Sequence, residues 1–369
     1  MQRVLIVNPF GIGDVLFTTP VIDALKRWQP SVQLGFLCNA RTAPMLARDP
    51  RIERLVVYEK SAFRRAWHAD KGAWWRMAST LWRELRGGRF DAALDFSLAE
   101  EFGLALMLAG IRRRVGLDYR RRGKFLTQRI FCPGFDDRPI GEYYLDAVRA
   151  LEVPVDGAQA SIWTSSADER TAETFLASCQ IGNRLLIGMA PGGGEAFGPS
   201  KAWYKRWGEA HFAQLAKLIV ERLGAVVVVF VGPGEESLGA AIVREAPDAM
   251  RLADRLTVCE MASLMRRCRL VITNDGGPMH VAVAAGVPSV SLFGPTDPQV
   301  YGPYPRNPDR HRVITQPVVC SPCYRRFKLP ECAGNVCLSW IEPAQVLAVV
   351  EDMTRGIAAR VSGRAPSAS

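Results

Sequence analysis

The stretch from Leu270 to Pro298 constrains the fold more than any other part of the chain. It opens with the apolar, β-rich run LVIT, which stops at the turn-forming cluster Asn-Asp-Gly-Gly. Pro278 suits the first turn of a helix, where its missing N–H would be unpaired anyway, and Gly286 suits the position after that helix. A second β-rich run follows at residues 289–293. The order strand, glycine turn, helix, strand predicts backbone N–H groups at a positive helix end, where a phosphate or pyrophosphate binds.

A second glycine turn lies near the start of the chain. Residues 3–7 predict a strand, a glycine-containing turn follows at residues 8–14, and an amphipathic helix is expected to reach about Trp28. That helix begins either near Asp14, with a bend at Pro20, or at a cap formed by Thr19. The turn does not complete GxGxxG, and the chain has no GxxxxGK[ST] motif. A dinucleotide oxidoreductase or a P-loop enzyme is therefore poorly supported.

The composition suits two domains of ordinary size, because the chain has 369 residues and 48% of them are hydrophobic. The predicted fold class is α/β, with two Rossmann-like domains that face each other across a cleft. We expect the first domain over residues 1–160 and the second over residues 180–342. A further helix is expected over residues 343–360, and the tail over residues 361–369 is predicted to be disordered.

Both glycine turns are expected at the cleft, because ligands of such sheets bind at the carboxyl ends of the strands. Strands are predicted near residues 3–7, 32–37, 54–58 and 91–95, and near residues 185–190, 226–231, 270–273 and 289–293. The first residues already belong to a predicted strand, and no stretch approaches the roughly 20 apolar residues of a membrane span. We therefore expect a cytoplasmic protein without a signal peptide.

The net charge of +10 is unevenly distributed. Residues 112–129 contain eight basic residues and one acidic residue, Asp118. Such a patch attracts polyanions. It is either a solvated surface or a binding surface for an acidic, phosphate-bearing acceptor or an anionic membrane. No nucleic-acid motif accompanies the charge, so no nucleic-acid partner is predicted.

Residues 64–83 contain four of the nine tryptophans, Trp67, Trp74, Trp75 and Trp82, and five basic residues. Positions 74, 75, 78, 81, 82 and 85 fall on one helical face. This face is either buried against a sheet or forms an interfacial segment that rests on an anionic membrane.

The cysteines Cys320, Cys323, Cys332 and Cys337 have the spacing C-x2-C-x8-C-x4-C. Tetrahedral zinc accepts four thiolates, so a structural zinc site is one interpretation. The spacing matches no common zinc module, and cytosolic thiols stay reduced. We expect packed free thiols, no metal and no cofactor.

Four segments, in order along nearly the whole chain, resemble glycosyltransferase family nine, the ADP-heptose:lipopolysaccharide heptosyltransferases. They are GIGDVL at 11–16 with the following Thr18-Thr19-Pro20, FGPSK at 197–201, NDGGPMH at 274–280, and FGPTDP at 293–298. The resemblance implies a GT-B architecture, which makes the helix over residues 343–360 a candidate to cross back onto the first domain. It also implies a metal-independent, inverting transfer of heptose from an ADP-sugar donor. The implied acceptor is an acidic, lipid-linked lipopolysaccharide core, and the enzyme is expected to be a monomer that rests peripherally on the inner membrane. The alternatives are a family member with another nucleotide sugar or acceptor, or a non-catalytic nucleotide-binding protein that docks on membranes.

Asp14 is the candidate catalytic base. It follows a glycine turn at the carboxyl end of a strand, and a carboxylate with an ordinary pKa near 3.9 is ionised at neutral pH and can accept a proton. The alternative is that Asp14 only caps the helix. The residues alone do not decide between the two roles, and the resemblance favours the base.

The donor phosphate requires a cationic side chain, because a helix end contributes only about 0.3–1 kcal/mol per charge. The resemblance implies a lysine that is followed closely by tryptophan. Lys201 matches the preceding Phe-Gly-Pro, whereas Lys205 matches the spacing to the downstream helix, since this chain carries a four-residue insertion relative to the pattern. We favour Lys201 and keep Lys205 as its rival.

The remaining site residues are also assigned through the resemblance. Asp275 either caps the helix or holds sugar hydroxyls, and Glu235 is the candidate ribose-binding acid, with Glu236 an equal match. The full set of donor contacts is Lys205, Glu235, Asp275, Gly276, Gly277, Pro278, Met279, His280, Thr296 and Asp297. The acceptor contacts are Gly13, Thr18, Arg113, Arg120 and Arg122.

Overall fold

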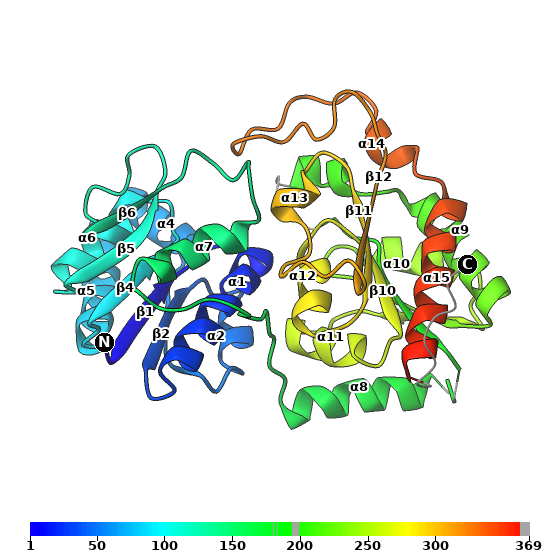
Figure 1. Cartoon of the computed structure of the whole chain (residues 1–369), viewed down its shortest axis with the longest axis horizontal. Coiled ribbons are helices and arrows are strands. Elements are labelled where there is room, and N and C mark those ends of the chain that lie inside the picture. Colours follow the sequence, from blue (N-terminus) through cyan, green and yellow to red (C-terminus); the bar gives the residue numbers. More distant parts are fainter. Residues whose placement is uncertain (180, 183, 194–198, 362–369) are drawn as a thin grey trace. The chain divides into compact units, whose positions relative to one another are not determined.

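The computed structural model describes residues 1–179, 181–182, 184–193 and 199–361. It divides into two compact units, Met1–Trp163 and Thr164–Ser369 (Figure 1). The prediction of a disordered tail concerns residues of which all but Val361 lie outside the described part of the chain.

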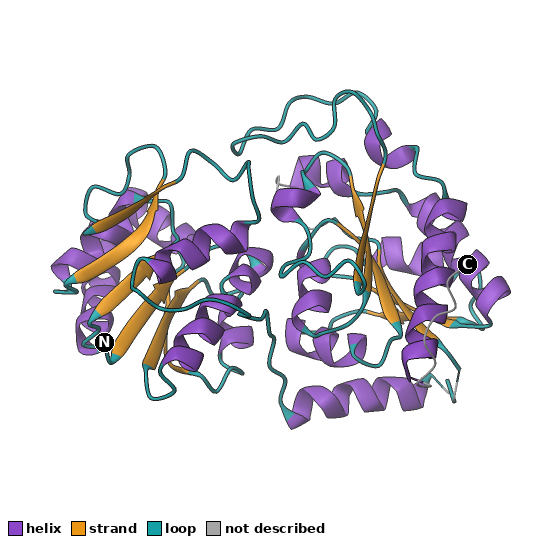
Figure 2. Cartoon of the chain, in the orientation of Figure 1, coloured by secondary structure: helices purple, strands orange, loops and turns teal. Residues whose placement is uncertain are grey.

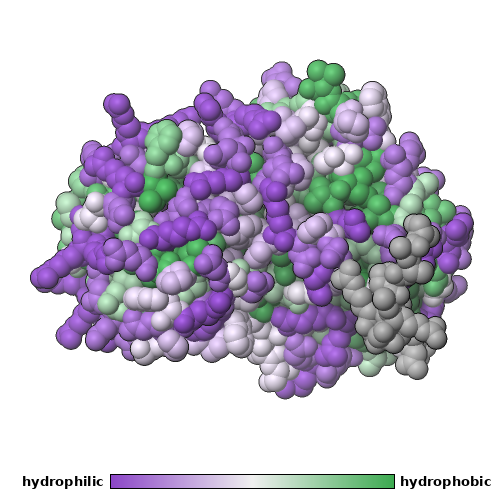
Figure 3. Space-filling model, viewed as in Figure 1, coloured by the Kyte–Doolittle hydropathy of each residue, from purple (hydrophilic) through white to green (hydrophobic). Residues whose placement is uncertain are grey.

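The first unit is a six-stranded parallel sheet in the order β3-β2-β1-β4-β5-β6. Its strands are β1 (Arg3–Val7), β2 (Gln33–Cys38), β3 (Ile52–Val57), β4 (Ala92–Asp95), β5 (Arg113–Asp118) and β6 (Gln128–Phe131). Its helices are α1 (Ile12–Phe17), α2 (Thr19–Trp28), α3 (Ala43–Leu46), α4 (Lys60–Ala69), α5 (Lys71–Gly87), α6 (Glu100–Leu108) and α7 (Ile140–Arg149). Hydrophilic side chains cover most of this unit's visible face in Figure 3, with smaller hydrophobic areas between them.

The second unit is also a six-stranded parallel sheet, in the order β12-β11-β10-β7-β8-β9 (Figure 2). Its strands are β7 (Leu186–Ala190), β8 (Val226–Phe230), β9 (Met250–Ala253), β10 (Leu270–Asn274), β11 (Ser289–Phe293) and β12 (His311–Thr315). Its helices are α8 (Ser166–Ser178), the 3-10 helix η1 (Pro199–Lys205), α9 (Glu209–Leu223), α10 (Glu236–Val243), α11 (Val258–Met265), α12 (Gly277–Ala284), α13 (Pro298–Tyr301), α14 (Val336–Ser339) and α15 (Pro343–Val361).

The central strands are buried throughout and mostly apolar, because helices cover both faces of a parallel sheet. All five residues of β8, VVVVF, are buried, as are all five of β10 and of β11. Strand pairing of this kind leaves little freedom in register, since every side chain of the strand is packed.

Both sheets have the same topology. The first strand of each unit, β1 or β7, lies at the centre, with the second strand on one side and the fourth on the other. The strand order therefore reverses between β1 and β4, and between β7 and β10. Ligands of open α/β sheets bind at the carboxyl ends of the strands at such a reversal. The two glycine turns follow β1 and β10, so each lies at one of these points.

The N-terminal helix differs from both predicted forms, because it consists of α1 and α2 with Thr18 between them. Gly11 is the N-cap of α1, and Pro20 lies in the first turn of α2. Pro20 thus starts a second helix after a break.

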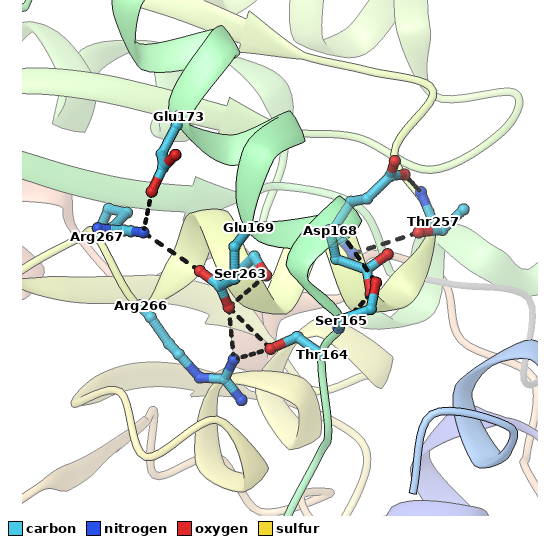
Figure 4. A network of polar contacts seen from close by, with 10 residues as sticks. Thr164, Ser165, Asp168, Glu169, Glu173, Thr257, Ser263, Arg266 and Arg267 are labelled. Atoms are coloured by element: carbon cyan, nitrogen blue, oxygen red, sulfur yellow. Dashed lines mark hydrogen bonds and ion pairs between the residues drawn. The ribbon is translucent and has the colours of Figure 1, made fainter.

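Helix α8 is attached to α11 by a network of polar contacts (Figure 4). The Glu169 carboxylate accepts hydrogen bonds from Thr164 at 2.8 Å and from Ser263 at 2.9 Å, and it pairs with Arg266 at 3.3 Å. Ser165 caps α8 in a capping box with Asp168. These contacts explain why the boundary between the units falls at Trp163 and Thr164.

Helix α15, the candidate to cross onto the first domain, has extensive contacts within the second unit. It packs against α9 and β11. Its buried residues Val346, Leu347, Val350 and Met353 lie in the same hydrophobic core as the strands of the second sheet. Their spacing forms one helical stripe, and burial of that stripe on α9 accounts for the position of the helix.

None of the helices in the described part of the chain combines the length and the apolar character needed to cross a membrane.

We predict that Leu347→Ala destabilises the protein by about 2–5 kcal/mol, because it leaves a cavity in the core under α15. Arg355→Ala, at an exposed position of the same helix, is expected to change the free energy of unfolding by less than about 0.5 kcal/mol. Urea unfolding of the full chain, followed by tryptophan fluorescence and circular dichroism, measures both. Equal stability of the two variants would show that α15 does not contribute to this core.

Candidate active site

The loops after β7 and β10 are held together by the side chain of Asn274, which is buried. Its Nδ2 donates to the carbonyl oxygens of Pro191 at 2.7 Å and Gly192 at 3.2 Å. Its Oδ1 accepts a hydrogen bond from the backbone N–H of Trp207 at 3.2 Å. One amide group therefore connects the ends of both strands to the segment that follows η1.

A buried ion pair lies next to this amide. Lys205 Nζ is 2.7 Å from Asp275 Oδ2, and the two side chains are 9% and 4% exposed. The hydroxyl of Thr296 donates to the same carboxylate oxygen. Charges taken out of water are costly unless they are paired and hydrogen-bonded, and this pair meets both conditions.

The pairing of Asp275 excludes one of the two roles predicted for it. The N-cap of α12 is Gly276, while the Asp275 carboxylate is directed to Lys205 and Thr296. Asp275 therefore does not cap the helix in this conformation. Gly276, Gly277 and Pro278 form the partly exposed start of α12.

His280 lies on the first turn of α12 and is buried. Burial lowers its pKa to about 4; the charge of Asp275 opposes this shift, and that of Lys205 adds to it. The imidazole is therefore neutral at pH 7. It can donate one N–H to a phosphate oxygen but carries no positive charge there.

The structure separates the two candidate lysines. Lys205 belongs to the cluster with Asp275, whereas Lys201 lies four residues earlier in η1 at a partly exposed position. Our preference for Lys201 rested on the preceding Phe-Gly-Pro, of which Phe197 and Gly198 lie outside the described residues. The η1 helix places Lys205 at the carboxyl edge of the second sheet.

Glu235, rather than Glu236, lies among these loops. Its carboxylate pairs with Arg206 at 3.1 Å and accepts a hydrogen bond from the N–H of Gly232 at 3.1 Å. Gly192 packs so closely on this carboxylate that a Cβ atom there would be 2.1 Å from Oε2. A Cβ atom at residue 192 would therefore displace the Glu235 carboxylate. Glu236, in contrast, is exposed.

Two of the predicted donor contacts have structural roles. The side chain of Met279 is fully buried in the unit, so only its backbone could contact a ligand. Asp297 caps α13 by accepting a hydrogen bond from the N–H of Gln299 at 2.8 Å. The side chain of Thr296 points to Asp275 and belongs to the cluster.

In the first unit, two asparagines hold the turn before Asp14. Asn8 Nδ2 donates to the carbonyl of Asp14 at 3.1 Å, and Asn39 Nδ2 donates to the carbonyl of Pro9 at 3.1 Å. Asp14 is in the first turn of α1 at a partly exposed position, next to Gly13, and the N-cap is Gly11. Asp14 is therefore not the N-cap residue of α1.

The acceptor contacts predicted in this unit do not lie together. Thr18 is fully buried and its hydroxyl donates to the carbonyl of Val15, so this side chain cannot reach an acceptor in this conformation. Arg113 begins β5, whereas Arg120 and Arg122 follow its carboxyl end. The six residues of β5 span roughly 20 Å, so the basic stretch is divided between opposite edges of the sheet. Only Arg120 and Arg122 share an edge with Asp14.

Asp95 is a buried carboxyl group that the sequence analysis missed. It ends β4, beside Val7 at the end of β1. Burial raises its pKa to about 6, while hydrogen bonds from Ser97 lower it. An acidic residue at the end of an otherwise apolar strand was the available signal, but the identity of the neighbouring strand was not readable from the sequence.

A separate hollow of about 650 Å³ lies at the amino-terminal edge of the second sheet and is lined by Arg184, Arg269 and Arg310 among others. These residues precede β7, β10 and β12. The length of the strands separates the hollow from the Lys205 cluster, so we do not assign the donor to it.

The four clustered cysteines are free thiols of differing exposure. Cys320 is exposed and Cys337 is buried, and burial raises the pKa of Cys337 to about 11. Within the described residues, no group of three or more His, Cys, Asp or Glu side chains is placed to hold a metal ion.

Comparisons with known proteins identify the family of the chain. The model of "Glycosyltransferase family 9 (heptosyltransferase)" matches residues 78–333. The chain is 27% identical to lipooligosaccharide heptosyltransferase 2 of Haemophilus influenzae, with 82% of this chain and 86% of the relative covered. It is 26% identical to lipopolysaccharide heptosyltransferase 2 of Escherichia coli K12, with 85% and 89% covered.

Among solved structures, that of E. coli ADP-heptose lipopolysaccharide heptosyltransferase II has a TM-score of 0.73 at 22% identity and covers 96% of this chain and 99% of its own. This likeness concerns the fold, and it confirms the predicted α/β class with two parallel Rossmann-like sheets, close to the GT-B heptosyltransferases. The family model covers more than two thirds of the chain. The protein is therefore a glycosyltransferase and belongs to glycosyltransferase family 9.

Proposed function

We propose that this enzyme transfers L-glycero-D-manno-heptose from the ADP sugar to an inner-core acceptor of lipopolysaccharide, with inversion and without a metal ion. The observation that carries the proposal is the cluster of Lys205, Asp275 and His280 at the start of α12. The names of the relatives, which are lipopolysaccharide and lipooligosaccharide heptosyltransferases, support the choice of sugar and acceptor.

The second unit binds the donor diphosphate in this proposal. The helix end at Gly276 and Gly277 contributes about 0.3–1 kcal/mol per charge, which is little for two phosphate charges. Lys205 supplies a full positive charge at the same edge, and Asp275 keeps its ammonium group in place. The neutral imidazole of His280 adds a hydrogen-bond donor. Glu235, which is held by Arg206 and Gly232, accepts hydrogen bonds from the ribose hydroxyls in this proposal.

The first unit binds the acceptor and supplies the base. Asp14 takes the proton of the acceptor hydroxyl, whose oxygen forms a bond to the anomeric carbon while the bond from that carbon to the β-phosphate oxygen breaks. The electron pair leaves with ADP, and the positive charge of Lys205 stabilises it. A single displacement of this kind inverts the anomeric configuration.

The acceptor also sets the location of the enzyme. Because the acceptor is an acidic, lipid-linked core, we propose that the enzyme is cytoplasmic and acts peripherally at the inner face of the inner membrane as a monomer. Arg120 and Arg122, which are exposed at the carboxyl edge of the first sheet, suit the acidic groups of such an acceptor.

Purified enzyme should release ADP from ADP-heptose in the presence of a core acceptor, and should not release nucleotide from UDP- or GDP-sugars. A coupled assay for the nucleoside diphosphate over a panel of donors measures this specificity. Turnover with UDP- or GDP-sugars alone would contradict the proposed donor.

Lys205→Met is expected to lower kcat/KM about 100- to 1000-fold, because it removes a preorganised charge from the leaving diphosphate. Lys201→Met should remain close to wild type. Since Lys205→Met also leaves Asp275 buried without a partner, the double variant Lys205→Met/Asp275→Asn provides a folded control, checked by circular dichroism. A larger loss in Lys201→Met than in Lys205→Met would reverse the assignment.

Asp14→Asn should lower kcat by about 100- to 10,000-fold, because the amide cannot accept the hydroxyl proton. The Kd for ADP, measured by calorimetry, should be unchanged, since the donor is bound by the second unit. Asp156→Asn, at an exposed position of the first unit, serves as the matched control. Full turnover by Asp14→Asn would exclude Asp14 as the base.

A further inference from the structure

The segment that carries four tryptophans does not bury them. It forms α4 and α5, and within α5 only Leu85 is buried, while every residue of α4 is at least partly exposed. Trp67, Trp75 and Trp82 are 49%, 67% and 39% exposed. The alternative that this face packs on the sheet is therefore wrong for these three side chains.

The exposed tryptophans of α5 form a stripe. Trp75 and Trp82 are seven residues apart, which is two helical turns, so they project on the same side of the helix. Arg76 and Arg83 have the same spacing and form a second, exposed stripe beside the first. The helix therefore presents an aromatic row and a cationic row to solvent, in addition to the side that packs through Leu85.

Trp67 extends the aromatic row from α4. Its ring contacts that of Trp74 edge-on, with 5.3 Å between the centroids, and Trp74 contacts Trp75 in the same way at 5.1 Å. The ammonium group of Lys71 lies 3.3 Å from the centre of the Trp67 ring. Cation–π contacts of this kind keep a charge and an exposed ring together.

Helix α6 continues the surface. Its residues Leu104, Met107 and Leu108 are 36%, 39% and 58% exposed, although Phe102 and Leu106 on its other side are buried. It is joined to α5 by the indole N–H of Trp82, which donates to the carbonyl of Leu108 at 3.1 Å. After Glu100 and Glu101 in its first turn, α6 exposes these apolar side chains, and an exposed apolar patch of this kind marks an interaction surface.

Helices α4 and α5 carry a net positive charge, although α6 begins with Glu100 and Glu101. Residues 60–87 contain seven basic residues against Asp70 and Glu84. Exposed tryptophan and leucine surrounded by lysine and arginine is the composition of a segment that lies in the interface of an anionic bilayer. A soluble protein partner or a second copy of this positively charged chain offers less charge complementarity.

We propose that α4, α5 and the exposed side of α6 form the membrane-docking face of the enzyme, and that its partner is a bilayer with anionic headgroups. The inference rests on the proposed function, since the acceptor is then a lipid in that bilayer. Trp67, Trp75, Trp82, Leu104, Met107 and Leu108 enter the interface, and the surrounding cations contact the headgroups.

The test is co-sedimentation of the full chain with vesicles of phosphatidylethanolamine and phosphatidylglycerol, compared with vesicles of phosphatidylcholine alone. The wild type should bind the anionic vesicles, and binding should weaken as salt screens the cations. Trp75→Ala/Trp82→Ala should reduce partition at least about tenfold, and Arg76→Gln/Arg83→Gln about fivefold per charge. Trp340→Ala removes a 57% exposed tryptophan of the second unit and should bind like wild type.

Activity separates this inference from the proposed function. Trp75→Ala/Trp82→Ala should retain transfer to a deacylated, water-soluble core acceptor and lose transfer to the same acceptor embedded in anionic vesicles. If the wild type bound vesicles but transferred no heptose, the docking face would be supported and the proposed heptosyltransferase function would be rejected. The docking face would be overturned if Trp75→Ala/Trp82→Ala bound vesicles as well as the wild type does, or if the wild type bound both vesicle types equally. It would also be overturned if light scattering showed a wild-type dimer that this variant abolishes.

Discussion

The buried ion pair between Lys205 and Asp275 is the interaction on which the candidate donor site depends. Two charges in the interior are tolerated because they lie 2.7 Å apart and because Thr296 donates to the same carboxylate. The pairing has a second consequence. Since Asp275 is engaged with the lysine, the N-cap of α12 is Gly276, which has no side chain to occupy the first N–H groups of the helix. A cation and a helix end are thereby presented at one edge of the sheet.

The two units repeat one topology and use it for opposite electrostatic tasks. In each, the strand order reverses beside the first strand, so a turn at that strand's carboxyl end is open to a ligand. In the first unit asparagines 8 and 39 hold a turn that presents a carboxylate, whereas in the second Asn274 holds loops that present an ammonium group. In the proposed mechanism, the carboxylate removes the proton of the acceptor, and the ammonium group stabilises the departing diphosphate.

Local sequence patterns predicted the strands whose own residues favour a buried β-strand. The central strands β1, β7, β8, β10 and β11 were predicted within one residue of their ends, because long apolar runs between turn residues have few alternatives. The strands β5, β6, β9 and β12 were missed. β5 begins with two arginines and reads as part of a basic surface, β9 has four residues, and β12 begins with His-Arg. Their strand character comes from pairing with a neighbour, which the sequence does not display.

The sequence by itself determined that two strand–turn–helix units exist, which glycines form the turns, and that Asp14 and Asp275 follow strands, because each of these properties is set by residues close in the chain. Tertiary structure alone decided that Lys205 rather than Lys201 pairs with Asp275, and that Thr18 and Met279 face inward. It also decided that Arg113 is separated from Arg120 and Arg122. The exposure of Trp67, Trp75 and Trp82 in α4 and α5 is the fourth property of this kind. The reason is common to all four. Burial and ion pairing depend on which backbone segments come together, and those segments, such as η1 and the end of β10, are about 70 residues apart in the chain.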